Sequence, residues 1–123
     1  MSKQLCPFCS PPQTLFENKH AYAIYDQYPV NDGHILIIPK RHVSDYFEAT
    51  STEQAALFEL VHAARAHLND NYSPDGFNIG INCGEAAGQT IFHAHIHVIP
   101  RYNGDMENPR GGVRGVIPDK RSY

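Results

Sequence analysis

The sequence has no tryptophan, only three cysteines and only a small excess of negative charge. An odd number of cysteines fits free thiols or metal ligands in a reducing compartment better than a disulfide framework. The formal net charge of -3 gives no electrostatic reason to expect nucleic acid or a membrane surface as a partner. No apolar run reaches the length of a membrane span, and the first residues lack the apolar stretch of a secretory signal. We therefore expect a cytoplasmic protein.

The 123 residues suffice for a single domain with its own core. Residues 1–20 form a turn-rich arm with a Cys-x-x-Cys pair, and residues 102–123 form a basic tail rich in glycine and proline. Between them, apolar runs predict strands, and an apolar stripe at helical spacing predicts a long helix. Strands are expected at 22–25, 34–39, 77–82 and 93–99, a short helix at 44–48 and a long helix at 50–71. This element order predicts an α+β domain with an antiparallel sheet.

The long helix has a start signal and a buried face. Thr50 and Glu53 have the spacing of a capping box, in which each side chain satisfies a backbone amide of the first turn. Leu57, Val61 and Leu68 then recur at the spacing of one helix face. The sequence thus predicts one long amphipathic helix.

What the sequence has in quantity is histidine, with eight residues, and three of them alternate in the run His93-Ala94-His95-Ile96-His97. In a strand, side chains point to opposite faces with a period of two, so the three imidazoles are expected to share one face. Histidine contributes little to strand packing and has polar nitrogens that need partners. Three such rings in register indicate a functional site.

This run resembles the signature of the histidine-triad (HIT) nucleotide hydrolases and transferases. Residues 33–40, Asp26 and residues 88–90 also match positions of that family, so the resemblance covers nearly the whole stretch from 6 to 101. It implies the HIT fold, with an antiparallel sheet of about five strands, one long and one short helix, and a homodimer whose sheets combine across the interface. Within the family, the chain is most similar to the bacterial proteins described as diadenosine-polyphosphate hydrolases.

The resemblance implies a role for each histidine at the site. His95 would be the nucleophile that attacks the α-phosphorus and forms a nucleotidyl-histidine, which water then resolves. The backbone carbonyl of His93 would hold the other ring proton of His95. His97 would donate to a phosphoryl or leaving-group oxygen, and His34 would line the same pocket, so that both touch the nucleotide.

The other expected nucleotide contacts come from loops and strand ends. The turn Gly88-Gln89-Thr90 can bring backbone donors close to a phosphate, where charge develops during the reaction. By resemblance, Asn82 contacts the nucleotide and Asp26 accepts the two ribose hydroxyls.

Simpler interpretations of some of these residues stand beside the functional ones. His97 could be a structural histidine of a partly buried strand, and His34 could mark only the start of a strand. Asp26 could serve a turn before Tyr28-Pro29.

Cys6 and Cys9 have the spacing of a zinc knuckle, which needs two further ligands. In zinc-containing members of the family that this sequence resembles, equivalents of His42 and His93 complete the site. Such a zinc would be structural, because protein atoms fill all four positions, and no catalytic metal is expected. A redox dithiol or two free thiols are the alternatives, and Cys83 is expected to be a packing residue.

The tail carries four cationic residues, which belong either to a flexible solvated segment or to an arm that reaches the active site of a partner subunit. In the second case the guanidinium groups would bind the leaving polyphosphate. Three apolar side chains suggest that part of the tail docks. The cationic residues are Arg110, Arg114, Lys120 and Arg121, and the apolar ones are Val113, Val116 and Ile117.

The sequence therefore predicts a hydrolase that acts on an adenine nucleotide ester or a dinucleoside polyphosphate such as diadenosine tetraphosphate. An adenosine phosphoramidase or a phosphorylase would use the same nucleophile, so the sequence does not separate them. A nucleotide-binding scaffold with little turnover is an alternative of another class. A metalloenzyme with a metal on the three histidines is disfavoured, because no carboxylate flanks the run.

Overall fold

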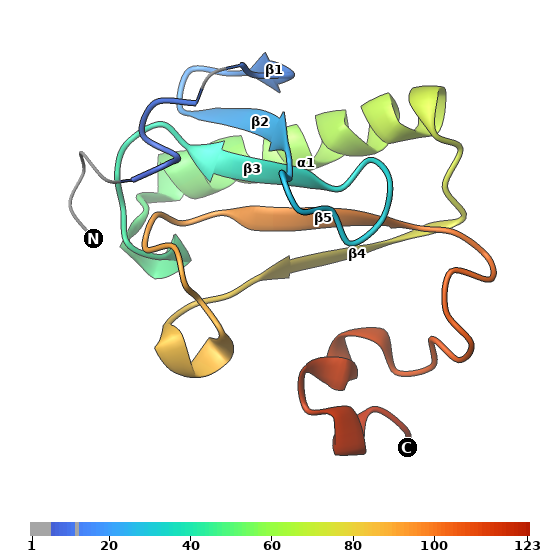
Figure 1. Cartoon of the computed structure of the whole chain (residues 1–123). Coiled ribbons are helices and arrows are strands. Elements are labelled where there is room, and N and C mark those ends of the chain that lie inside the picture. Colours follow the sequence, from blue (N-terminus) through green and yellow to red (C-terminus); the bar gives the residue numbers. More distant parts are fainter. Residues whose placement is uncertain (1–5, 12) are drawn as a thin grey trace.

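The computed structural model describes residues 6–11 and 13–123, so Pro12 and the beginning of the predicted arm, residues 1–5, lie outside the described residues. The described residues form a five-stranded antiparallel sheet with a long helix, α1, across one face (Figure 1). The predicted α+β fold is confirmed. In spatial order the strands are β1 (Phe16–Glu17), β2 (Ala21–Tyr25), β3 (Ile35–Pro39), β5 (Ile96–Arg101) and β4 (Gly76–Ile81).

The central strand β3 is buried along its whole length, as its branched apolar residues predict. It pairs antiparallel with β2 on one side and β5 on the other, where Leu36 lies opposite His97. This pairing brings His34, which immediately precedes β3, into the neighbourhood of the histidine run.

Helix α1 (Ser51–Asn71) begins and ends close to its predicted limits. The Thr50 hydroxyl accepts from the Glu53 amide at 3.1 Å, and the Glu53 carboxylate accepts from the Thr50 amide at 2.8 Å, which is the predicted capping box. The short helix before it is only a 3-10 turn, Tyr46–Glu48. It is short because Asp45 caps its start and Thr50 already caps the start of α1.

The prediction that the histidine run opens the last strand is wrong by three residues, because β5 begins at Ile96. The Ala94 amide donates to the Val43 carbonyl at 2.8 Å, outside the sheet. His93 and His95 therefore belong to the segment that enters the strand, and only His97 lies within it.

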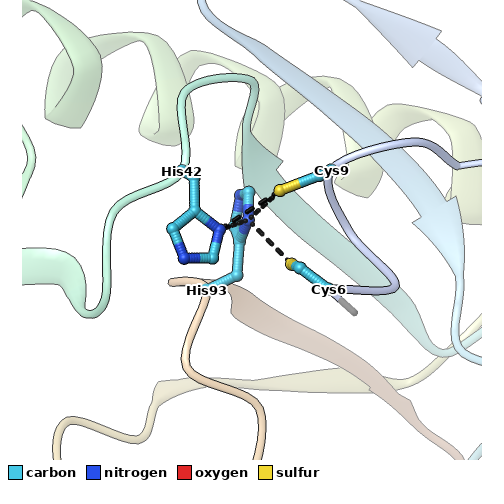
Figure 2. A group of neighbouring side chains, drawn as sticks. All are labelled: Cys6, Cys9, His42 and His93. Carbon is cyan, nitrogen blue, oxygen red and sulfur yellow. Dashed lines mark hydrogen bonds between the residues drawn. The ribbon is translucent and has the colours of Figure 1, made fainter. Parts of the chain in front are cut away.

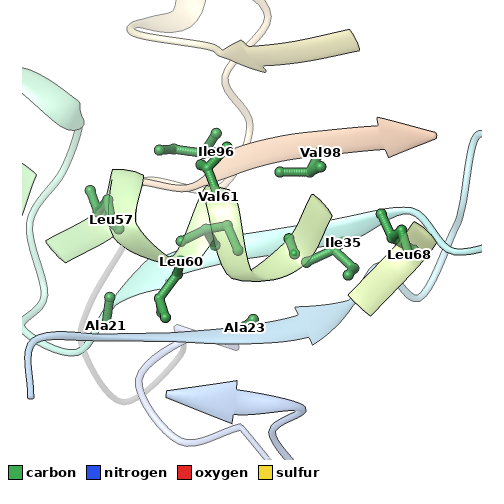
Figure 3. Close-up of a cluster of buried hydrophobic side chains, with 11 residues drawn as sticks. Ala21, Ala23, Ile35, Leu57, Leu60, Val61, Leu68, Ile96 and Val98 are labelled. Carbon is green, nitrogen blue, oxygen red and sulfur yellow. The ribbon is translucent and has the colours of Figure 1, made fainter. Parts of the chain in front are cut away.

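Figure 3 shows the core between α1 and the sheet. Full burial of one such aliphatic side chain typically contributes about 1.5–3 kcal/mol. The opposite face of the sheet carries a second cluster, formed by the arm and by side chains of β2 and β3 that point away from α1: Cys6, Phe8, Tyr22, Leu36 and Ile38. The histidine site lies on this second face.

The tail forms two 3-10 helices, Gly112–Val116 and Pro118–Lys120, beyond the β4 edge of the sheet (Figure 1). The apolar tail residues that are expected to dock, Val113, Val116 and Ile117, are 59–77% exposed, so they do not dock on their own chain. None of the described helices is long and apolar enough to cross a membrane.

Candidate active site and metal-binding cluster

Four predicted metal ligands from three separate segments converge on one point (Figure 2). Cys6 and Cys9 come from the arm, His42 follows β3, and His93 precedes β5; their ligand atoms lie within 4.8 Å of one another. The Nδ1 atom of His93 is 3.3 Å from the Cys6 sulfur and 3.2 Å from Nδ1 of His42. Ligand atoms around a tetrahedral zinc lie about 3.3–3.8 Å apart, given bond lengths of about 2.0–2.3 Å. The cluster is therefore already close to the size that a metal requires.

The protonation state of His93 also suits a residue that binds a metal ion. Its Nε2–H donates to the Pro39 carbonyl at 2.7 Å, which leaves the Nδ1 lone pair facing the two thiols and His42. Burial lowers the pKa of His93, and the positive charge of a nearby His42 would lower it further. A neutral ring with a free lone pair at this position can bind a metal ion.

His95 is oriented by the main chain of His93. Its Nδ1–H donates to the His93 carbonyl at 2.9 Å, so its lone pair is on Nε2. Burial lowers the pKa of His95, which keeps the ring neutral near pH 7. The edge of the Phe8 ring packs against it with the ring centres 5.1 Å apart. This arrangement fixes the tautomer of His95 and leaves a lone pair on Nε2.

His34 and His97 form a second pair with the opposite arrangement of protons. The Val30 amide donates to Nδ1 of His34 at 3.0 Å, so His34 carries its proton on Nε2 and donates it to Nδ1 of His97 at 3.0 Å. The remaining nitrogen of His97, Nε2, is then an N–H donor. Burial, with a smaller contribution from His95 and His34, lowers the pKa of His97 to about 4, so the ring is a neutral donor near pH 7.

Asp26 joins this pair, and the ligand atoms of Asp26, His34 and His97 also lie within 4.8 Å of one another. The Oδ2 atom of Asp26 is 3.5 Å from Nε2 of His34. A metal there would need a lone pair at His34 Nε2, whereas the Val30 amide makes that nitrogen a donor. The geometry therefore favours a hydrogen-bonded group, in which His34 and His97 each carry a proton on Nε2, over a metal site.

Asp26 also has the turn role that the sequence allowed, because its Oδ1 accepts from the Tyr28 amide at 2.9 Å. Its second oxygen lies beside His34, and Asp26 is one of the residues that line the pocket. The turn and a contact to substrate are thus compatible.

A pocket of about 860 Å³ opens beside His95. The predicted residues that line it are Asp26, Asn82, Gly88, Gln89, Thr90, His95 and His97. The prediction that His34 lines the pocket is wrong: it is 2% exposed and lies behind His97, because the sheet buries the start of β3. His93 is fully buried, and only its carbonyl serves His95.

The side chain of Gln89 braces the loop that carries it. Its amide nitrogen donates to the Ser44 carbonyl at 2.7 Å, and its oxygen accepts from the Gly84 amide at 2.8 Å. The neighbouring Gly88 has φ = +91°, a conformation that a side chain would strain. The loop therefore has a defined shape on the pocket wall.

Sequence reasoning missed the apolar part of the pocket, which is formed by Phe8, Pro11 and Leu15 of the arm with Ile24 and Leu36 of the sheet. For the strand residues Ile24 and Leu36, the sequence did contain a sign that they cover a pocket or a further layer. A strand that is apolar on both faces has to cover something on the face away from the helix. No periodicity marks the arm residues.

A HIT domain model matches residues 9–104 of the chain. An uncharacterized HIT-like protein of Mycoplasma pneumoniae is 41% identical over 86 residues, which cover 70% of this chain and 60% of the relative. A Mycobacterium tuberculosis protein named AP-4-A phosphorylase is 36% identical over 80% of this chain and 55% of its own length. An Arabidopsis thaliana protein named adenylylsulfatase is 39% identical over 81% of this chain and 54% of its own length. The chain thus spans little more than half the length of these enzymes.

Among solved structures, a Zn-bound histidine triad family protein from Mycobacterium smegmatis superposes with a TM-score of 0.78 at 33% identity, covering 87% of this chain and 82% of that one. The match shows that this chain has a fold that is known from experiment.

Proposed function

The chain belongs to the HIT domain family, and on that premise we propose that it hydrolyses a nucleotide ester or anhydride at the α-phosphorus through a covalent intermediate on His95. The observation that carries this proposal is the tautomer of His95, whose Nδ1–H is held by the His93 carbonyl while Nε2 has the lone pair. A neutral imidazole with a free lone pair at a pocket wall is a competent nucleophile.

In the first step the Nε2 lone pair of His95 attacks phosphorus, and the bond from phosphorus to the leaving oxygen breaks. The His93 carbonyl stabilises the positive charge that the ring gains, because Nδ1 keeps its proton. His97 donates its Nε2–H to a phosphoryl or leaving-group oxygen. In the second step water attacks phosphorus, the N–P bond breaks, its electron pair returns to Nε2, and the water proton leaves to solvent.

The substrate class that we propose is an adenine nucleotide ester or a dinucleoside polyphosphate such as diadenosine tetraphosphate. The supporting features are the carboxylate of Asp26, suited to a ribose diol, and the loop at 88–90, suited to phosphate oxygens. The name of the mycobacterial relative favours a second candidate, a phosphorylase in which phosphate replaces water in the second step. A phosphoramidase would share the first step.

We propose a structural zinc ion on Cys6, Cys9, His42 and His93, which would tie the arm to the entrance of β5. The sulfur and nitrogen donors are those that zinc prefers, and the Zn-bound relative supports the assignment.

A homodimer through β4 is proposed as well. In the described sheet β4 is an edge strand, and its Ile79 is 44% exposed.

Arg110 and Arg114 stack on the Tyr123 ring and do not line the pocket of their own chain, so they would reach a polyphosphate only in a partner. Deletion of the residues after Tyr102 should then slow hydrolysis of long polyphosphates more than of short AMP esters, and equal effects would contradict the arginine role.

The test of the function is a trapping experiment. The protein is mixed with diadenosine tetraphosphate, with and without phosphate and a chelator, and quenched samples are analysed by mass spectrometry. An AMP adduct on His95 supports the proposal, and dependence of turnover on phosphate identifies the phosphorylase. Chelator-sensitive turnover without an adduct, or binding without turnover, would overturn it.

A further inference from the structure

The arm crosses the pocket between two fixed points. At one end, Cys6 and Cys9 belong to the metal-binding cluster. At the other end, the Leu15 amide donates to the Ala23 carbonyl at 2.8 Å, and Phe16 pairs with Ala23 in the sheet. The described arm residues that face the pocket between or beside these points are Pro7, Phe8, Pro11, Gln13, Thr14 and Leu15. One wall of the pocket is therefore an irregular segment that depends on its two ends.

The apolar character of this wall begins with Phe8, which is 7% exposed and packs with Leu36 beneath the arm. Its carbonyl accepts from the Tyr22 hydroxyl, and its ring reaches both His95 and His93. A flat apolar group bound beside His95 would lie against this ring. Ribose and phosphate, which are polar, gain little from such a surface.

We infer that the metal on Cys6, Cys9, His42 and His93 sets the affinity for the nucleobase, because it fixes the arm as the apolar wall against which the base packs. This inference rests on the proposed function and names the part of the substrate that the metal controls. None of the four ligand residues lines the pocket, so the metal would act on the substrate only indirectly. Its effect passes through two cysteines, the Phe8 ring between them in the chain and the segment that follows.

Such coupling is reciprocal. If the metal strengthens binding of the base, then a ligand with a base strengthens binding of the metal by the same factor. Packing of a base on an aromatic or apolar wall supports a factor of about ten. A ligand without a base should produce no coupling.

The test compares AMP with ribose 5-phosphate, which lacks the base. Isothermal titration calorimetry measures the dissociation constant of each for the zinc-loaded and the metal-free protein. Removal of zinc should weaken AMP about tenfold and ribose 5-phosphate less than about twofold. Chelator competition should show that AMP, but not ribose 5-phosphate, tightens zinc binding by about the same tenfold factor.

Three variants make the comparison specific. His42→Gln removes a ligand outside the arm and should reproduce the metal-free result. Phe8→Leu keeps both cysteines and should weaken AMP selectively while zinc stays bound. Cys83→Ser is the matched cysteine control, because Cys83 belongs to neither the cluster nor the pocket wall, and it should behave like the wild type.

Equal losses for AMP and ribose 5-phosphate, or no loss for AMP, would overturn the inference while leaving the proposed function intact. Failure of the zinc-loaded wild type to bind AMP at all would overturn the proposed function and the inference together. The two failures are thus distinguishable in one experiment.

Discussion

His93 and His97 lie two residues before and two residues after His95, and their imidazoles have opposite uses. His93 donates a hydrogen bond to the main-chain carbonyl of Pro39 and keeps a lone pair for the metal-binding cluster. His97 accepts a hydrogen bond from His34, which is itself held by the main-chain amide of Val30. The same side chain thus becomes a ligand or a donor according to whether the backbone nearby offers an acceptor or a donor.

The largest effect is expected at His95, which lies between the metal-binding cluster and the His34–His97 pair. His95→Ala removes the proposed nucleophile and should lower kcat by a factor on the order of 10⁴, because the proposed mechanism has no other group that forms the covalent intermediate. Zinc content should stay at that of the wild type, as measured by metal analysis of the same sample. His62→Ala, an exposed histidine of α1, is the matched control and should retain activity. Full turnover by a folded His95→Ala sample would refute the mechanism.

The next effect is on the free energy of unfolding, and it distinguishes the metal-binding cluster from the His34–His97 pair. Zinc at 100 times its dissociation constant should stabilise the wild type by about 2.7 kcal/mol, because metal binds only the folded cluster. Denaturant unfolding with and without zinc measures this difference in the free energy of unfolding. His42→Ala should abolish it and His34→Ala should preserve it. Loss of the zinc effect in His34→Ala would mean that the two clusters are not independent.

A smaller effect is expected from the buried member of the donor pair. His34→Ala should lower kcat about tenfold, since His97 loses the partner that fixes its proton on Nε2. The KM for an AMP ester should stay close to that of the wild type, because His34 does not line the pocket. Steady-state kinetics with one ester separates the two constants. An increase in KM without a change in kcat would instead indicate direct contact with substrate.

The smallest effect concerns the loop that carries His42. Arg41, next to it, binds the carboxylate of Glu53 at 2.8 Å. This ion pair, with the Thr50 contacts of the capping box, holds the pKa of Glu53 at about 2, below its usual 4.5. The stabilisation is therefore complete above the unfolded pKa and disappears as the pH falls toward 2.

Glu53→Gln tests this contribution. It should cost about 1 kcal/mol at neutral pH, and the difference from the wild type should shrink as the pH falls below about 4.5. Denaturant unfolding of both proteins across the acid range measures it. A difference that is constant down to pH 2 would show that the charge of Glu53 does not contribute.

Much of the fold could be predicted because its signals are local or periodic. The capping box of α1 and the continuous apolar run of β3 are visible in short windows of sequence, and both elements form where expected. The start of β5 was mispredicted, because alternation alone does not show that Ala94 bonds to Val43 outside the sheet.

The site was only partly predictable, for a different reason. The spacing of Cys6 and Cys9 indicates a metal knuckle, but His42 and His93 lie tens of residues away, and only the family resemblance singled them out. The proton arrangement depends on main-chain groups of Pro39 and Val30, which carry no mark in the sequence. Burial of His34 behind His97 follows from the pairing of β3 with β5.

The carbonyl of His93 that holds His95 has a consequence for how this protein can change over evolutionary time. Every amino acid has that carbonyl, so no substitution at position 93 deletes the group that orients the His95 ring. Descendants of such a chain can therefore lose or exchange their metal ligands while the reactive imidazole keeps its alignment, provided that the local backbone path is maintained.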